Sequence, residues 1–232
     1  MTSKEFEETL LYHTKELPGA LPYKKKYKLF VKTKDKGSKI FDFFAQRFPY
    51  VSPDTWKEKI DSGNLTINNK KILLSTVLEQ GDLLEHSDVQ QTDPLVSTNI
   101  KLLYDNDDFS VITKPSPLPM HSCGRYQKNT LENLLNISFP SINYKIVHRL
   151  DSNTTGLLIL AKSNKAAHFF QELFKNKTIK KTYLAEVEGL VIKDEFESNI
   201  SFSSKKGFGG RRSLENGNIE AQTKFKVLKR HS

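Results

Sequence analysis

Residues 147–162 decide the fold of the second half of the chain, and they read VHRLDSNTTGLLILAK. A histidine, an arginine and an aspartate fall within four residues, and small polar residues, a glycine and an apolar run follow. The apolar run at 156–161 is bounded by polar residues and has the length of a buried strand. Asp151 therefore lies on a loop entering such a strand, where catalytic side chains concentrate, and we expect it on the floor of a cleft. This makes Asp151 a candidate catalytic residue; an aspartate that caps or forms a salt bridge is the alternative.

The segments around this stretch predict a mixed α+β domain. Residues 100–112 read as strand, turn and strand, and the proline-rich loop 114–121 can be neither helix nor central strand. A short helix is expected from residue 130, and the apolar period at 163–175 predicts an amphipathic helix. Residues 181–187 are expected to return as a strand. The resulting domain would be built around a mostly antiparallel sheet.

The first half of the chain predicts a second, smaller domain. Residues 1–28 read as an irregular leader, because Pro18, Gly19 and Pro22 interrupt regular structure. After it, helices are expected at 38–48 and 53–63, and short strands at 29–31, 65–67, 71–74 and 81–84. The polar stretch 91–99 is expected to be a linker. The chain would thus consist of a leader, a small domain at 29–90, a linker, and a larger domain at 100–232.

Composition limits the class of protein. A hydrophobic content of 37% and a charged content of 27% are ordinary for a globular protein. No apolar run approaches the roughly 20 residues that a membrane span needs, so no membrane partner is expected. The single cysteine, Cys123, excludes an internal disulfide framework and suits the reducing cytoplasm, where we expect the protein. Cys123 and His121 have no second pair at ligand spacing, so no metal site is expected.

The basic charge is concentrated in two segments. The formal net charge is +9, with 36 Lys and Arg against 27 Asp and Glu. Residues 23–39 hold eight lysines and one acid, and residues 201–232 hold eight Lys or Arg and two acids. Such segments most simply bind a polyanion such as nucleic acid; a solvated lysine-rich surface is the alternative. The candidate contacts to a nucleic-acid backbone are Lys24, Lys25, Lys26, Arg211 and Arg212, together with Lys114 of the proline-rich loop.

Four motifs in order resemble one family. HRLDSNTTGLLILAK, at 148–162, resembles the RluA-family signature HRLDxxTSGLLLxAK, with Thr155 in place of the usual serine. Three further segments are similar to family motifs, namely VITKPSPLPMH (111–121), NKTIKKTYLAEVEG (176–189) and GNIEAQTKFKVL (217–228). The chain is therefore identified as a member of the RluA family of RNA pseudouridine synthases.

The N-terminal domain carries a second resemblance. The order of helices and strands at 29–90, with SGNLTINNK and GDLL, resembles the alpha-L RNA-binding module, named from a ribosomal protein. The family pattern favours Arg or Lys soon after the serine of the second helix, where this chain has Trp56 and Lys57. A small helical cap without RNA contact is the alternative.

The RluA resemblance implies a reaction and roles for four residues. The enzyme would isomerise a specific uridine of ribosomal or transfer RNA to pseudouridine, without metal or cofactor, after flipping the base out of its stack. Asp151 would be essential, whether it attacks the ribose, attacks the base or abstracts a proton. Arg149 would act near the position in the RNA that the flipped base leaves, and Tyr183 would pack on the flipped uracil. The alternatives are that Arg149 pairs with Asp151 and that Tyr183 is a core aromatic. His148 would support this substrate-binding loop.

The chain ends before one family motif. Family members continue beyond the strand at 217–228 to an arginine-rich motif whose basic residue pairs with the catalytic aspartate, whereas this chain stops at Ser232. We therefore expect an incomplete catalytic domain whose activity is uncertain, and a monomer if the domain is complete. The alternative functions are an impaired synthase that acts only as an RNA-binding protein, and an unrelated hydrolase that depends on Asp151.

Overall fold

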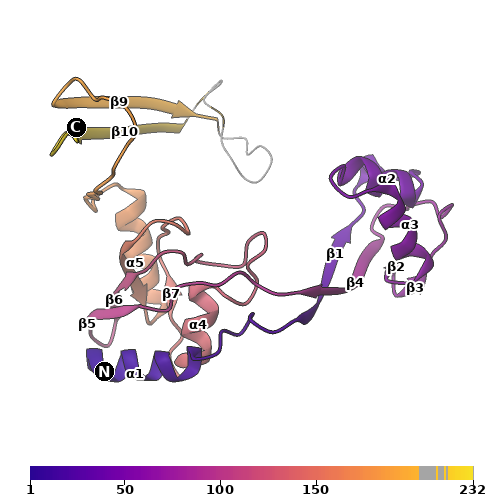
Figure 1. Ribbon diagram of the computed structural model, residues 1–232, viewed down its shortest axis with the longest axis horizontal. Helices are drawn as coiled ribbons and strands as arrows, with labels where there is room; N and C mark the ends of the chain where they lie inside the picture. Colours follow the sequence, from indigo (N-terminus) through magenta and orange to yellow (C-terminus); the bar gives the residue numbers. More distant parts are fainter. Residues whose placement is uncertain (204–212, 214–216, 218, 232) are drawn as a thin grey trace. The chain divides into compact units, whose positions relative to one another are not determined.

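The computed structural model describes residues 1–203, 213, 217 and 219–231. The chain divides into two compact units, Met1–Ile179 and Lys180–Ser232, and each is described by itself. The mixed α+β class and the antiparallel sheets predicted from the sequence are confirmed (Figure 1). Arg211 and Arg212 lie outside the described residues, as do residues 204–210.

The N-terminal segment is not the irregular leader that the sequence predicted. Helix α1 (Ser3–Thr14) begins with a capping box, in which Thr2 and Glu5 satisfy each other's backbone N–H groups. Phe6 and Leu10, one helical turn apart, are buried in the main core, and Phe6 stacks on Phe139 at 4.7 Å between ring centroids. The prolines that suggested a leader lie after this helix and therefore do not prevent it.

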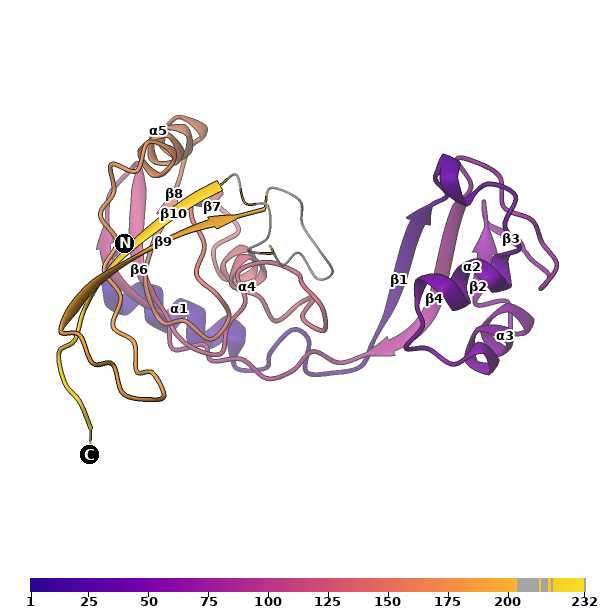
Figure 2. The same ribbon diagram turned by 90° about the horizontal axis from the view of Figure 1, so that it is seen from above.

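The basic strand and two short helices form the N-terminal sheet region. The long strands β1 (Tyr23–Phe30) and β4 (Leu83–Gln91) pair antiparallel as a ribbon (Figure 2). The sheet has the strand order β1-β4-β2-β3, and the remaining elements are η1 (Thr33–Asp35), α2 (Ile40–Arg47), α3 (Pro53–Asp61), β2 (Leu65–Ile67) and β3 (Lys70–Lys71). Ser52 caps α3 through the backbone N–H of Thr55, as its position before Pro53 predicted. A core that includes Ile40, Phe44, Trp56, Leu65 and Leu84 holds these elements together.

The sheet that carries the signature loop has cores on both of its faces. Its strand order is β5-β6-β8-β7, with β5 (Lys101–Asp105), β6 (Phe109–Lys114), β7 (Lys145–Ile146), β8 (Gly156–Ala161), and helices α4 (Leu131–Ser138) and α5 (Asn164–Lys175). Because side chains alternate along a strand, Leu158 and Leu160 join the core with α1 and α4, whereas Ile159 and Ala161 pack with α5. Figures 1 and 2 show α5 on the opposite side of this sheet from α1 and α4.

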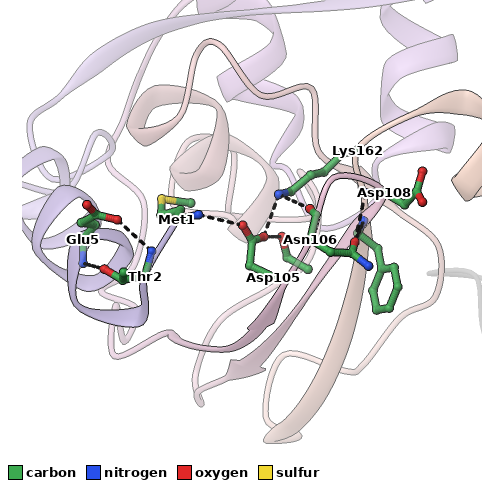
Figure 3. A network of polar contacts seen from close by, with 9 residues as sticks. Met1, Thr2, Glu5, Asp105, Asn106, Asp108 and Lys162 are labelled. Atoms are coloured by element: carbon green, nitrogen blue, oxygen red, sulfur yellow. Dashed lines mark hydrogen bonds and ion pairs between the residues drawn. The ribbon is translucent and has the colours of Figure 1, made fainter.

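A polar network fixes the far end of β8. Asp105 forms an ion pair with the Lys162 ammonium at 2.7 Å and accepts a hydrogen bond from the Met1 amino group at 3.2 Å (Figure 3). It also accepts a hydrogen bond from the hydroxyl of Ser110 at 2.5 Å. Lys162 also donates to the carbonyl oxygen of Asn106 at 2.6 Å. Burial acts to raise the pKa of Asp105, but hydrogen bonds from Lys162 and Ser110 outweigh it and hold the pKa below its ordinary value. The lysine that closes the signature motif therefore ties β8 to the turn between β5 and β6.

The second unit is a hairpin preceded by an irregular segment. Strands β9 (Glu195–Phe202) and β10 (Ile219–Lys226) pair antiparallel, and Phe196 stacks on Phe225 at 4.7 Å between centroids. The strand predicted at 181–187 is wrong, because these residues are irregular in the structure. A strand requires a partner for its backbone groups, and β9 pairs only with β10 among the described residues.

Candidate active site

The signature loop places Asp151 between two fixed positions. Leu150 is 7% exposed and belongs to the main core, and the backbone N–H of Thr154 donates to the carbonyl oxygen of Asp151 at 3.0 Å in a turn. Gly156 then starts β8 with a φ of +137°, which only glycine adopts readily. The side chain of Asp151 itself is exposed. Within residues 1–179 it therefore lies on the surface, and the recessed position expected from the sequence is not found there.

Lys114 lies beneath this loop. Its side chain is 1% exposed, and its ammonium donates to the carbonyl oxygens of Pro115, Leu118 and Ser152 at 2.9, 2.8 and 3.1 Å. The backbone N–H of Leu118 donates to the same Ser152 oxygen at 3.0 Å. The predicted contact of Lys114 with an RNA phosphate does not fit this geometry, because three internal carbonyl oxygens already occupy the buried ammonium. Lys114 instead fastens the proline-rich loop to the loop of Asp151.

The charge of Asp151 also acts on Lys114. Burial lowers the pKa of Lys114 from its ordinary value, and the negative charge of Asp151 opposes that shift. A cation is therefore near the candidate catalytic carboxylate within this unit, although the sequence suggested that Asp151 would lack one. The sequence signal for this relationship was weak, because it depends on strand register. Lys114, the last residue of β6, pairs with Gly156, the first residue of β8.

His148 and Arg149 have different environments although they are neighbours. His148 is half-buried, its Nε2 accepts the backbone N–H of Ile159 at 3.0 Å, and its ring lies 4.5 Å from that of Phe174. These contacts fit a residue that supports the loop more closely than one that touches substrate. Arg149 is exposed, and its side chain makes no hydrogen bond or ion pair with any described residue. An ion pair between Arg149 and Asp151 is therefore absent from the described part of the chain.

The remaining candidates lie away from this loop in the sequence. Tyr183 belongs to the second unit, where its side chain is 60% exposed. Lys24, Lys25 and Lys26 lie on β1, where Lys24 and Lys26 are exposed and the Lys25 ammonium lies 4.3 Å from the centre of the Tyr27 ring. These lysines line an edge strand of a ribbon, as backbone-binding cations would.

Two further properties concern the described residues as a whole. Among them, no group of three or more His, Cys, Asp or Glu side chains is arranged to hold a metal ion. None of the described helices is both long and apolar enough to cross a bilayer.

A family comparison classifies the chain. The family described as RNA pseudouridylate synthase matches residues 108–232, a span that includes Lys114, the loop of Asp151, and Tyr183. The chain belongs to this RNA pseudouridylate synthase family.

Two curated relatives agree with that assignment. The chain is 34% identical over 168 residues to the mitochondrial tRNA pseudouridine(32) synthase of Saccharomyces cerevisiae, covering 72% of this chain and 36% of that protein. It is 27% identical to RNA pseudouridine synthase 7 of Arabidopsis thaliana, covering 88% of this chain and 51% of that protein. The solved structure of human RNA pseudouridylate synthase domain containing 1 aligns with 54% of this chain and 50% of its own, at 23% identity and a TM-score of 0.43. The chain thus spans about half or less of the length of these proteins.

Proposed function

We propose that this protein isomerises a specific uridine in ribosomal or transfer RNA to pseudouridine, with Asp151 as the essential residue. The observation that carries the proposal is the signature loop of the matched family, on which the carboxylate of Asp151 is exposed and its backbone is fixed at both ends. An exposed carboxylate can reach a flipped nucleotide without first breaking an internal ion pair. The names of two relatives point to these substrates, a mitochondrial tRNA pseudouridine(32) synthase of Saccharomyces cerevisiae and a ribosomal large subunit pseudouridine synthase of Rickettsia bellii.

The proposed reaction rearranges one nucleotide. The bond between C1′ of the ribose and N1 of uracil breaks, the base turns, and a bond forms between C1′ and C5. The hydrogen on C5 passes to solvent and N1 gains a proton, so the product is an isomer of the substrate. A carboxylate such as Asp151 can act in this sequence as nucleophile or as base. These bond changes and proton transfers balance without a metal or a cofactor.

The residues around Asp151 have proposed roles that follow from their exposure. The Arg149 guanidinium is available to stack or hydrogen-bond where the target base leaves the RNA, because no described residue engages it. Tyr183 would pack on the flipped uracil. His148 and Lys114 would hold the loop in place from below, through the contacts to Ile159 and to Ser152.

The N-terminal region is proposed to bind RNA as an alpha-L-like module. Its support is the basic strand β1, an edge strand of the four-stranded sheet, which carries Lys24, Lys25, Lys26 and Lys28. The two helices and short strands that follow also match the order expected for such a module. A cytoplasmic location stays a prediction.

The decisive experiment measures tritium release from transcripts that carry tritium at C5 of uracil. Transfer and ribosomal RNA transcripts are incubated with the 232-residue chain, with Asp151→Asn, and with Asp107→Asn as a control of equal charge at an exposed position. Release by the chain and the control but not by Asp151→Asn supports the proposal. RNA binding without release by any variant would favour the alternative, an RNA-binding protein with impaired catalysis. Equal release by Asp151→Asn would remove Asp151 from its role.

A further inference from the structure

The linker after β4 contains a buried carboxylate that the proposed reaction does not use. Asp93 is 5% exposed, and its Oδ2 accepts the backbone N–H groups of Gln127, Lys128 and Asn129 at 2.6, 2.5 and 2.8 Å. Three donors on one ionised oxygen form a strong, charge-assisted set of hydrogen bonds. These residues belong to the loop 121–129 that precedes α4. Asp93 therefore anchors this loop to the end of the ribbon.

A second set of contacts holds the other strand of the ribbon in the same place. The hydroxyl of Tyr23, at the start of β1, donates to Oδ1 of Asp93. Gly19 links Asp93 to the loop residue Asn129. Its carbonyl oxygen accepts the Asp93 N–H at 2.9 Å, and its own N–H donates to Oδ1 of Asn129 at 2.8 Å. A Cβ on Gly19 would lie 2.7 Å from that of Asp93, so only glycine fits. The side chain of Gln91 completes the contact by donating to the carbonyl oxygen of Arg125 at 2.8 Å.

The anchor keeps its negative charge at neutral pH. Burial acts to raise the pKa of Asp93, but hydrogen bonds from Tyr23 and from the backbone of residues 127–129 outweigh it and hold the pKa below its ordinary value. Burying a charge costs free energy unless it is hydrogen-bonded, and Asp93 offsets this cost with donors from the loop 121–129 and from β1. Asp93 lies between two cationic segments, the loop 121–129 and the start of β1, and its hydrogen bonds join them.

The anchor brings cations of the loop next to cations of the ribbon. Arg125 is exposed, and its side chain makes no hydrogen bond or ion pair with any described residue. The Lys128 ammonium lies 4.1 Å from the centre of the Tyr23 ring, and Lys24 and Lys25 follow Tyr23 on β1. We propose that the loop 121–129 and the base of the β1–β4 ribbon form one cationic surface for the RNA backbone, in which Arg125 and Lys128 contact phosphates and Asp93 is the positioning residue.

This surface extends the proposed function, on which it depends, to residues outside the signature motif. RNA is the partner that the cations favour, because the family acts on RNA and because guanidinium and ammonium groups beside an aromatic ring suit a phosphate backbone. The loop that contributes Arg125 continues directly from the proline-rich loop that Lys114 fastens beneath Asp151. RNA bound to this surface would therefore follow the loop 121–129 and the proline-rich loop toward Asp151.

The sign of one mutational effect tests the positioning role. Asp93→Ala removes a negative charge, so electrostatics alone predicts tighter binding of RNA. The proposed surface predicts the opposite, a several-fold weaker binding of transfer RNA transcripts, because the two cationic segments would no longer be held together. Asp61→Ala removes the same charge from an exposed position at the end of α3 and should bind RNA as tightly as the unmodified chain or more tightly. Filter binding across a salt series measures all three proteins.

The phosphate contacts are tested by the salt series itself. Arg125→Ala and Lys128→Ala should each reduce the slope of log affinity against log salt by about 1. In the Asp93→Ala background these reductions should become smaller. Hydrogen exchange of the amides at 127–129 reports the anchor directly, and faster exchange in Asp93→Ala is expected. Tyr23→Phe, which removes a single donor, should change both measurements in the same direction if Asp93→Ala does not fold.

The outcomes separate this inference from the proposed function. If the amides at 127–129 exchange faster while RNA binding by Asp93→Ala matches that by Asp61→Ala, the anchor is purely structural and the proposed surface is wrong. Unchanged salt slopes in Arg125→Ala and Lys128→Ala would also overturn it, with RNA binding itself intact. Failure of the unmodified chain to bind transfer or ribosomal RNA would instead count against the proposed function, and the surface would be lost with it.

Discussion

The ammonium of Lys114 lies 3.1 Å from the carbonyl oxygen of Ser152, the residue that follows Asp151. This contact joins the end of β6 to the loop that enters β8, and it does so from inside the protein, since Lys114 is 1% exposed. A cation with three backbone oxygen partners can hold a loop in one conformation and still act electrostatically on the carboxylate above it. The candidate site is thus built from two strand ends that lie side by side.

Replacing Lys114 should therefore affect the loop more than the rest of the fold. Lys114→Met keeps the length of the side chain but leaves the carbonyl oxygens of Pro115 and Leu118 without the lysine donor, which costs roughly 1–3 kcal/mol for each buried group left unmet. The carbonyl oxygen of Ser152 loses one of two donors and keeps the backbone N–H of Leu118. We expect a lower unfolding temperature and slower tritium release. Lys101→Met, at an exposed position of β5, should change neither. A Lys114→Met protein of unchanged stability would show that water replaces the ammonium.

Asp151→Asn should abolish isomerisation and leave RNA binding intact. The amide is nearly the same size, and the exposed side chain contributes little to packing, so the fold should persist. An amide is neither a base nor an effective nucleophile, so tritium release should fall to background. Circular dichroism and filter binding check that the variant is folded and still binds RNA. A variant that binds RNA poorly would indicate that Asp151 shapes the RNA surface and not only the chemistry.

Arg149→Ala should separate substrate contact from stability. Because no described residue pairs with Arg149, its removal should change the free energy of unfolding by no more than about 0.5 kcal/mol, as for ordinary surface substitutions. Turnover should nevertheless fall, and Arg149→Lys should recover little of it, because an ammonium cannot stack as a planar guanidinium does. A large loss of stability in Arg149→Ala would instead indicate a structural ion pair.

Lys162→Met should destabilise the unit that holds the site. The Lys162–Asp105 pair is mostly buried, with side-chain exposures of 15% and 9%, and removing one partner leaves a buried charge at a cost of about 3 kcal/mol. Denaturant unfolding should show this loss, and Lys165→Met, at an exposed position of α5, serves as the control. Similar midpoints for the two variants would mean that Ser110 and the Met1 amino group are sufficient partners for Asp105.

His86 should make the N-terminal region sensitive to acid. Burial, and then the charge of Lys59, lower the pKa of His86 from 6.5 to about 4. Between these values the unfolded chain binds a proton that the folded chain does not, so stability should fall as the pH drops from about 6.5 to 4. His86→Gln, which does not titrate, should show a flatter dependence of the unfolding midpoint on pH in this range. Equal dependence in both proteins would contradict the shifted pKa.

Local sequence signals predicted several elements because their causes lie within a few residues. The apolar run at 156–161 predicted β8, the spacing of apolar residues predicted α5, and Ser52 before Pro53 predicted the start of α3. Helix α1 was missed although Phe6 and Leu10 lie one turn apart, because the prolines that follow it suggested an irregular segment. The strand predicted at 181–187 failed because a strand needs a partner, and these residues pair with no strand among the described residues.

The sequence by itself determined the family, the loop of Asp151 and the basic character of β1, because each is encoded in contiguous residues. Only the tertiary structure decided that the Lys114 ammonium is buried and binds backbone carbonyl oxygens, which leaves it no contact with a phosphate. The same holds for Asp93, which joins the ribbon to the loop 121–129. The hydrogen bonds concerned connect residues 38 and 34 positions apart in the chain. Such contacts follow from strand register and from the burial of a charge against distant backbone groups, and no local pattern of residue types specifies either.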